Sequence, residues 1–181
     1  MKKSMFLFVF VMAVFTLTAQ ENLISNAGFT KRTDKGRLAS WSIYGVGEWT
    51  VEKDGIEGNI LKITLVQKLK ATGGECRGTI YQKLPELKPG KYELSVRYRG
   101  KIRAFWVSLA AKKDGKSKGL GSGWVEKQKF KPDAKYPGWF KFYKILTVPQ
   151  GMKEFMIEVA GFGPENTPLE LTGVELYSEG E

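Results

Sequence analysis

The chain of 181 residues contains no histidine, and this limits the chemistry that its side chains can perform. Without an imidazole there is no Ser-His-Asp or Cys-His catalytic arrangement, no histidine-ligated zinc and no histidine acid or base. Cys76, the one cysteine, stands in GGECRG without a base beside it, so we interpret it as a structural or incidental thiol that forms no intrachain disulfide. We therefore predict no catalytic residue of these kinds, no metal and no cofactor.

Paired carboxylates could still support catalysis, because glycoside hydrolysis needs only two acidic groups about 5 to 10 Å apart. Glu154 and Glu158 lie on one face of a predicted strand, where four residues extend over about 13 Å. That separation is too long for one glycosidic bond, although pairs between strands stay open. A small polysaccharide-active enzyme is therefore kept as an alternative.

Tryptophan and tyrosine rings are the other groups that could bind a ligand. Some stand where a strand begins or a core position is expected, and we predict that these are structural: Trp41, Tyr92 and Trp139. Trp106 differs, because it shares its strand face with Ser108 and Ala110. A flat ring beside small residues is a platform on which a sugar ring can stack. An edge residue covered by a loop is the other possibility, and the sequence leaves both open.

Short β-strands must position these side chains, since no long helical periodicity, heptad or internal repeat is found. Apolar and polar residues alternate in seven segments: 59–65, 78–84, 91–99, 103–111, 139–149, 154–160 and 169–177. Such alternation indicates one buried and one exposed face per strand, and many short strands separated by turns are typical of a β-sandwich. We predict an all-β fold of about eight to ten strands. The glycine-rich stretch 112–123 predicts a mobile loop, and 126–138 predicts surface structure.

The first nineteen residues are predicted to be a secretory signal peptide. Lys2 and Lys3 precede an apolar run of about thirteen residues, which is short of the ~18 needed to span a bilayer. The mature chain, 20–181, is then one domain with 27 Lys and Arg against 19 Asp and Glu. This charge favours contact with anionic polymers or surfaces, or serves only solubility, and composition leaves both open. We expect a secreted, periplasmic or cell-surface protein without a transmembrane segment.

Five segments occur in an order that resembles a known family: NLISNAGF (22–29), LASWSIYG (38–45), IYQKLPELKPGKYELSVRYRG (80–100), WFKFYKILTVPQGMKEFMIEVAGFG (139–163) and LTGVELY (171–177). Together they resemble the carbohydrate-binding modules of the family 4 and 9 type. Those modules are β-sandwich jelly rolls of the galactose-binding-like class. The resemblance covers nearly all of residues 22–177 and implies binding of β-glucans, xylans or related chains in a cleft on the concave sheet.

The resemblance also implies which side chains bind the sugar. By position, these are one tyrosine, one amide and two carboxylates, to which the outward face of 103–111 adds a tryptophan and a serine. They are Tyr44, Gln82, Glu154, Glu158, Trp106 and Ser108. Arg97 and Arg99 are second-rank candidates, expected on the opposite, convex side.

The chain departs from the family pattern in two respects. Many members hold a structural calcium ion with an acidic residue after the first Phe and paired aspartates before the final Val. Thr30 and Thr172-Gly173 occupy those positions here, so we predict no calcium at that place. These modules also usually accompany a glycanase in one chain, whereas this sequence shows a module alone.

The leading hypothesis is a secreted, non-catalytic module that binds polysaccharide or oligosaccharide, acidic chains included, by stacking on Tyr44 and Trp106. The alternative is a cell-surface structural or protein-interaction sandwich that keeps the fold without a sugar site. We expect a monomer that binds no nucleic acid. The identity of the glycan and of any separate glycanase partner stays open.

Overall fold

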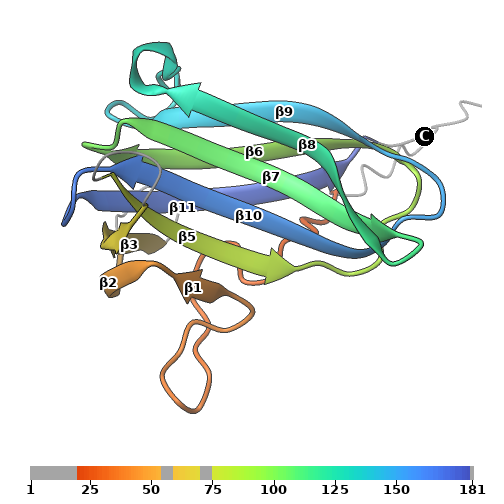
Figure 1. Cartoon of the computed structure of the whole chain (residues 1–181), viewed down its shortest axis with the longest axis horizontal. Helices are drawn as coiled ribbons and strands as arrows, with labels where there is room; N and C mark the ends of the chain where they lie inside the picture. Colours follow the sequence, from red (N-terminus) through yellow and green to blue (C-terminus); the bar gives the residue numbers. More distant parts are fainter. Residues whose placement is uncertain (1–19, 54–58, 70–74, 180–181) are drawn as a thin grey trace, which may run out of the picture.

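The alternating segments fold into two antiparallel sheets packed face to face (Figure 1). The computed structural model describes residues 20–53, 59–69 and 75–179, so the predicted signal peptide at 1–19 lies outside the described residues. We name the two layers the β10 sheet and the β11 sheet, after their central strands.

The β10 sheet has the order β1 (Ser42–Tyr44), β5 (Cys76–Lys83), β10 (Lys153–Gly163), β7 (Ala104–Lys113) and β8 (Lys116–Glu126), with β4 (Gln67–Lys68) beside β5. The β11 sheet has the order β2 (Val46–Lys53), β3 (Asn59–Leu65), β11 (Pro168–Ser178), β6 (Gly90–Gly100) and β9 (Phe140–Val148). From β5 to β11 every connection crosses between the sheets except the one from β7 to β8. This alternation confirms the predicted all-β jelly-roll sandwich.

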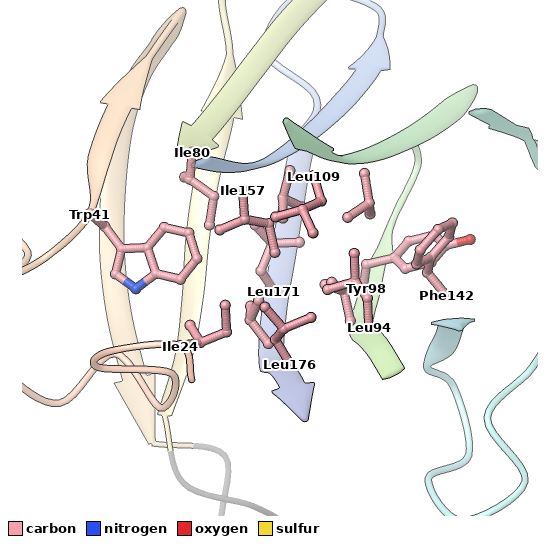
Figure 2. Close-up of a cluster of buried hydrophobic side chains, with 14 of the residues drawn as sticks. Ile24, Trp41, Ile80, Leu94, Tyr98, Leu109, Phe142, Ile157, Leu171 and Leu176 are labelled. Carbon is pink, nitrogen blue, oxygen red and sulfur yellow. The ribbon is translucent and has the colours of Figure 1, made fainter. Parts of the chain in front are cut away.

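Inward side chains of both sheets form the core between the layers (Figure 2). Those buried to 1% exposure or less include Ile80, Leu109 and Ile157 from the β10 sheet, and Leu94, Tyr98 and Leu171 from the β11 sheet. Burying one aliphatic side chain of this size stabilises the fold by about 1.5–3 kcal/mol, so the period-two alternation holds the layers together. The predicted structural rings Trp41, Tyr92 and Trp139 are also buried, which confirms that prediction.

The glycine-rich stretch 112–123, predicted to be a mobile loop, is instead the end of β7 and most of β8. Asp114 and Gly115 both have positive φ angles, of 51° and 74°. Two such residues form a tight hairpin turn whose twist matches that of paired strands, and Asp-Gly is a favoured sequence for it. Lys113 pairs directly with Lys116 across this turn.

Two glycines of β8 explain why a strand forms where few side chains are available to pack. A Cβ atom added to Gly121 or Gly123 would lie 2.2 Å from the side chain of Leu146 or Phe142, respectively, both on β9. Backbone therefore fills the place that a core side chain takes elsewhere. β8 closes this edge of the sandwich by direct contact with β9.

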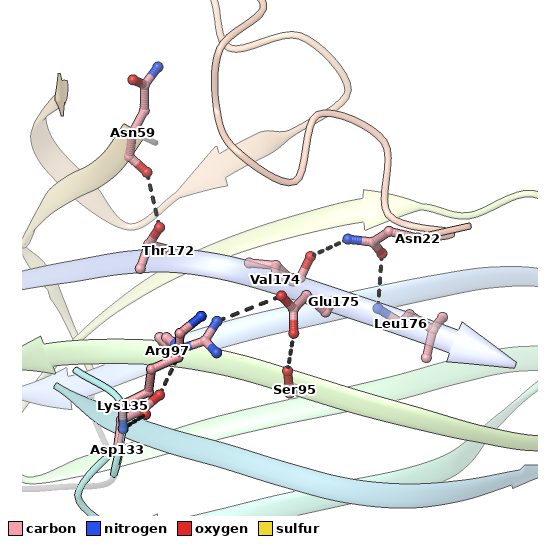
Figure 3. A network of polar contacts seen from close by, with 10 residues as sticks. All are labelled: Asn22, Asn59, Ser95, Arg97, Asp133, Lys135, Thr172, Val174, Glu175 and Leu176. Carbon is pink, nitrogen blue, oxygen red and sulfur yellow. Dashed lines mark hydrogen bonds and ion pairs between the residues drawn. The ribbon is translucent and has the colours of Figure 1, made fainter. Parts of the chain in front are cut away.

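The outer face of the β11 sheet is partly covered by the chain itself (Figure 3). The segment 131–139, between β8 and β9, folds back over β6, where Arg97 is buried. Arg97 Nε donates to Asp133 Oδ2 at 2.7 Å, and its Nη1 lies 3.6 Å from Glu175 Oε1. The guanidinium carbon lies 4.9 Å from the centre of the Tyr136 ring. Residues of the covering segment thus surround this arginine.

Helical structure between β8 and β9 is limited to a short 3-10 turn, η2 (Lys127–Lys129). No helix in the described part of the chain is both long enough and apolar enough to cross a membrane.

Candidate functional site

The outer face of the β10 sheet brings aromatic and polar side chains together. Strand register places one row of outward residues across five strands: Tyr44, Thr79, Ala160, Trp106 and Trp124. The next row along the strands is Ser42, Tyr81, Glu158, Ser108 and Ser122. Since neighbouring strands lie about 4.8 Å apart, each row extends over about 19 Å. The face therefore has rings toward its two edges and small or polar residues between them.

An open depression with a volume of about 430 Å³ lies over β5, between β1 and β10. Its lining consists of Tyr44, Arg77, Thr79, Tyr81, Met156 and Glu158. The Tyr44 side chain is 60% exposed, and its hydroxyl accepts a hydrogen bond from Gln67 Nε2 at 3.1 Å. An exposed ring beside polar groups offers both stacking and hydrogen bonding to a ligand.

Arg77 stands between this depression and the tryptophans. Its guanidinium forms an ion pair with Glu158 across the strands. It also lies 5.3 Å from the centre of the Trp106 ring and 5.7 Å from that of Phe162. These contacts fix the orientation of the planar guanidinium over the rings. Tyr44 and Trp106 consequently lie on the same face of the β10 sheet, but Trp106 does not line the depression at Tyr44.

Three buried polar atoms on β4 and β5 have no hydrogen-bond partner among the described residues: Gln67 Oε1, Arg77 Nε and Thr79 Oγ1. A buried polar atom without a partner destabilises a protein by about 1–3 kcal/mol, and such atoms are therefore few. These atoms are covered by their neighbours, so the groups that the depression offers to a ligand are the exposed Tyr44 ring and the partly exposed Arg77 and Glu158 side chains.

Two tryptophans form a second aromatic area over β7 and β8. Trp106 is half-buried and packs on a small apolar cluster of Ala104, Ala160 and Phe162. Trp124 is 54% exposed, and its ring centre lies 4.6 Å from that of Phe162. Sequence reasoning missed Trp124 as a site residue because the stretch before it was predicted to be a loop. The Asp-Gly turn signal would have revealed the strand.

Four of the six predicted site residues share the outer face of the β10 sheet. Tyr44 and Glu158 line the depression. Ser108 lies directly opposite Glu158 on β7, and Trp106 lies in the neighbouring row. Arg77 was not predicted as a site residue, because the strand was expected to begin at residue 78. Its odd number, shared with the outward-facing Tyr81, would have placed it on the same face.

The predicted placement of Gln82 with these residues is contradicted by the structure. Gln82 is 2% exposed and lies on the core side of β5, paired with Ile157. Its amide donates to the Ser25 carbonyl at 2.7 Å and accepts from the Ser25 N–H at 2.9 Å. Side chains alternate along a strand, so a residue two positions from core Ile80 must point the same way. Gln82 therefore holds the N-terminal segment in place.

Glu154 lies apart from the depression at Tyr44. A bulge between Lys153 and Met156 interrupts the pairing of β10 with β7, so the regular spacing expected between Glu154 and Glu158 does not apply. The Glu154 carboxylate accepts a hydrogen bond from Lys112 Nζ at 2.5 Å, and this contact lowers the pKa of the carboxyl group. Glu154 lines a second depression, of about 280 Å³.

The residues at the family's calcium position make other contacts. The Thr172 hydroxyl donates to the Asn59 carbonyl at 3.1 Å, and Gly173 has a left-handed φ of 54°. Within residues 20–53, 59–69 and 75–179, no three Asp, Glu, Cys or His side chains gather as metal ligands. The lack of calcium at this place stays a prediction.

Comparison with known proteins identifies the fold. No protein-family model matches the sequence, and no curated protein is detectably similar to it. A family 61 carbohydrate-binding module in complex with β-1,4-galactotriose has a similar structure, with 17% identity, 88% of this chain and 99% of that chain covered, and a TM-score of 0.59. A family 4 module has 16% identity, coverage of 86% and 99%, and a TM-score of 0.56. The chain has the β-jelly-roll fold of carbohydrate-binding modules.

Other similar structures extend this comparison. The C-terminal family 22 carbohydrate-binding module of Clostridium thermocellum Xyn10B has 12% identity, coverage of 87% and 98%, and a TM-score of 0.52. The enzymatically active domain of Bacteriophage CBA120 tailspike protein 4 has a TM-score of 0.56, but this chain spans only 21% of it. The predicted carbohydrate-binding-module fold is thus confirmed, whereas assignment to family 4 or 9 stays a prediction.

Proposed function

We propose that the protein is a secreted, non-catalytic module that binds a glycan chain on the outer face of the β10 sheet. The observation that carries this proposal is the open depression at Tyr44, where an exposed ring lies beside the polar side chains of Arg77 and Glu158. Its place on a carbohydrate-binding-module fold adds support, since similar modules bind β-1,4-galactotriose or xylan.

The lining residues have chemistry that suits sugar rings. Tyr44 stacks on the apolar face of a ring, because amphipathic aromatic side chains provide contact area at low entropic cost. A sugar hydroxyl both donates and accepts hydrogen bonds, so it can pair with the exposed Tyr44 hydroxyl and with the partly exposed side chains of Arg77 and Glu158. Trp106 and Trp124 provide a second platform across the ion pair of Arg77 with Glu158.

Binding without catalysis follows from the carboxylates of this face. Glycoside hydrolysis uses two carboxyl groups, one of them protonated. Glu158 is the one carboxylate in the lining of the depression at Tyr44, and it is ion-paired with Arg77. The lining of this depression therefore lacks the second carboxyl group that hydrolysis needs.

Affinity gel electrophoresis on β-glucan, xylan and galactan tests the proposal with three proteins. The wild type should be retarded by at least one polymer, and Tyr44→Ala should lose most of this retardation. Tyr143→Ala is the matched control, because Tyr143 is 51% exposed on the outer face of the β11 sheet. Both variants remove an exposed ring, so their folding stability should stay within about 0.5 kcal/mol of the wild type.

Three results would oppose the proposal. Lack of retardation by any glycan favours the protein-interaction alternative, for which Tyr143 and Ile145, 49% exposed on the same strand, offer an apolar surface. Equal losses in the two tyrosine variants would place the site elsewhere. Shortening of the polymer during incubation would indicate an enzyme.

Export is a separate part of the proposal. We expect residues 1–19 to be removed, leaving a domain of residues 20–181. Mass spectrometry of protein collected outside the cytoplasm should give a chain beginning near Gln20. Retention of the first nineteen residues in the collected protein would contradict this part and leave glycan binding untouched.

A further inference from the structure

We propose, on the basis of the glycan-binding function above, that the ligand is an acidic chain whose carboxylates are bound by Lys83 and Lys112. These lysines lie at one end of the outer face of the β10 sheet. The uncharged part of the same chain would occupy the depression at Tyr44.

The two depressions of this face adjoin each other. The second depression is lined by Lys83, Leu84, Ala110, Ala111, Lys112, Ser117, Glu154, Phe155 and Met156. Met156 also lines the depression at Tyr44, so the two meet at this side chain. The row containing Met156 lies four residues along β10 from the row containing Tyr44, which corresponds to about 13 Å. An extended ligand can therefore occupy both.

The charges of the two depressions differ. In the depression at Tyr44, one arginine and one glutamate neutralise each other. The second depression has Lys83 and Lys112 against the single carboxylate of Glu154. That carboxylate already accepts a hydrogen bond from Lys112, which shows that the second depression stabilises an anionic oxygen. A uronate group would meet a net positive charge here but not at Tyr44.

Positive charges accumulate at this end of the β10 sheet and destabilise the folded chain when no ligand is bound. Lys112 lies directly opposite Lys153, and Lys113 directly opposite Lys116. Like charges at directly opposed positions of neighbouring strands are destabilising. On the side of the depression, Lys83, Lys112 and Lys153 lie at this end of β5, β7 and β10, and Glu154 is the carboxylate of the lining. A bound anionic chain would reduce this repulsion.

The nonpolar lining of the second depression sets a second requirement for the ligand. Met156, Ala110 and Leu84 leave a surface in the second depression that is mostly nonpolar beside the two ammonium groups. Such a surface suits a sugar ring, which has a nonpolar face, better than a small inorganic anion. The structure therefore favours a polymeric uronate over free phosphate or sulfate.

The test uses polygalacturonate, alginate and glucuronoxylan, each in native form and after chemical reduction of its carboxyl groups, together with neutral β-glucan and galactan. Dissociation constants are measured for the wild type and for the double variant Lys83→Gln/Lys112→Gln. The control double variant is Lys53→Gln/Lys91→Gln, which makes the same charge change at exposed positions of the β11 sheet.

We expect the wild type to bind at least one native acidic chain roughly 2- to 30-fold more tightly than its reduced form, as two partly exposed ion pairs allow. The difference should shrink with added salt, because the screening length falls from about 10 Å at about 0.1 M to about 3 Å at about 1 M. Lys83→Gln/Lys112→Gln should lose this preference, whereas the control variant should keep it.

Each opposing result is distinct. Equal binding of native and reduced chains, or binding of neutral chains alone, overturns the acidic specificity while glycan binding stands. Equal losses in both double variants attribute the preference to net charge and overturn the assignment to Lys83 and Lys112. Failure of the wild type to bind any of these polymers overturns glycan binding itself.

Discussion

Each outer face of the sandwich has an arginine that pairs with a glutamate and lies over a tryptophan ring. On the β10 sheet, Arg77 pairs with Glu158 and lies 5.3 Å from the centre of the Trp106 ring. On the β11 sheet, Arg99 pairs with Glu170 and lies 4.4 Å from the ring of a different tryptophan, Trp139. The two sets of side chains are nearly the same in type.

Their surroundings differ. Trp139 belongs to the segment 131–139, which folds back over β6, and its side chain is 2% exposed. Trp106 belongs to the sheet itself and is only half-buried, with the open depression on the other side of Arg77. Side-chain type alone therefore does not define a binding site here. What distinguishes the β10 face is an open depression in which the exposed Tyr44 ring lies beside polar side chains.

The largest difference between the two faces should appear when an arginine is removed from each. Arg97→Ala leaves the buried Asp133 carboxylate without its guanidinium partner, and should lower the free energy of unfolding by about 3–5 kcal/mol. Arg77→Ala removes a partly exposed ion pair and should lower it by about 1 kcal/mol or less. Urea denaturation measures both values. Similar losses at the two positions would show that the two faces do not differ in how strongly an arginine stabilises the fold.

For glycan binding, loss of the arginine on the β10 sheet should have a larger effect than loss of an arginine on the β11 sheet. Arg77→Ala removes a charged hydrogen-bond donor from the proposed site and should weaken binding by roughly 10- to 150-fold. Arg99→Ala is the matched control, since it removes the same group from the covered face, and it should leave the dissociation constant unchanged. Titration calorimetry with the best polymer measures both. An effect of Arg99→Ala equal to that of Arg77→Ala would mean that the faces do not differ in function.

The edge strand that presents Trp124 should be sensitive at its inner positions. Gly123→Ala forces a methyl group against Phe142 and should destabilise the fold by about 1–3 kcal/mol. Gly119→Ala, on the same strand, meets no atom within 4 Å and should change stability little. Thermal denaturation of the two variants measures the difference. Equal melting temperatures would show that β8 does not pack closely against β9.

The smallest expected effect is a pH dependence of the stability that the covered face contributes. Burial alone would raise the pKa of the Asp133 carboxyl group, but hydrogen bonds from the Lys135 N–H and the Arg97 side chain outweigh it and hold the pKa below its ordinary value of 3.8. The stabilisation from this depressed pKa is present above the ordinary value and is lost as pH falls through the folded-state value. Unfolding free energies measured between about pH 5 and about pH 2 should therefore decline less steeply for Asp133→Asn than for the wild type. Parallel declines of the two proteins would show that the Asp133 carboxyl group does not contribute to the pH dependence of stability.

Much of the fold was predictable because the period-two pattern is a local property of the sequence. Tyr92, Leu94, Val96 and Tyr98 alternate with polar residues and do form the inward face of β6. The same reasoning placed Trp106 and Ser108 together on an outward face, as observed. Carry-over by position was wrong where it went against parity: Gln82 shares the parity of buried Ile80 and points into the core.

The remaining parts of the site depend on features that sequence alternation does not encode. The bulge in β10 that separates Glu154 from the depression at Tyr44 depends on pairing with β7. The ion pair of Arg77 with Glu158 joins strands whose residues are 81 positions apart in the chain. The covering of Arg97 depends on a loop whose path is set by tertiary contacts.

The lysines of β8 have a consequence for contacts between copies of the protein. β8 is the last strand of its sheet, and an unprotected last strand offers hydrogen-bonding groups to a strand of another molecule. Lys116 and Lys118 are exposed along it, so two copies approaching side by side would bring their ammonium groups together. This electrostatic barrier opposes growth of a shared sheet and thus fibrous aggregation.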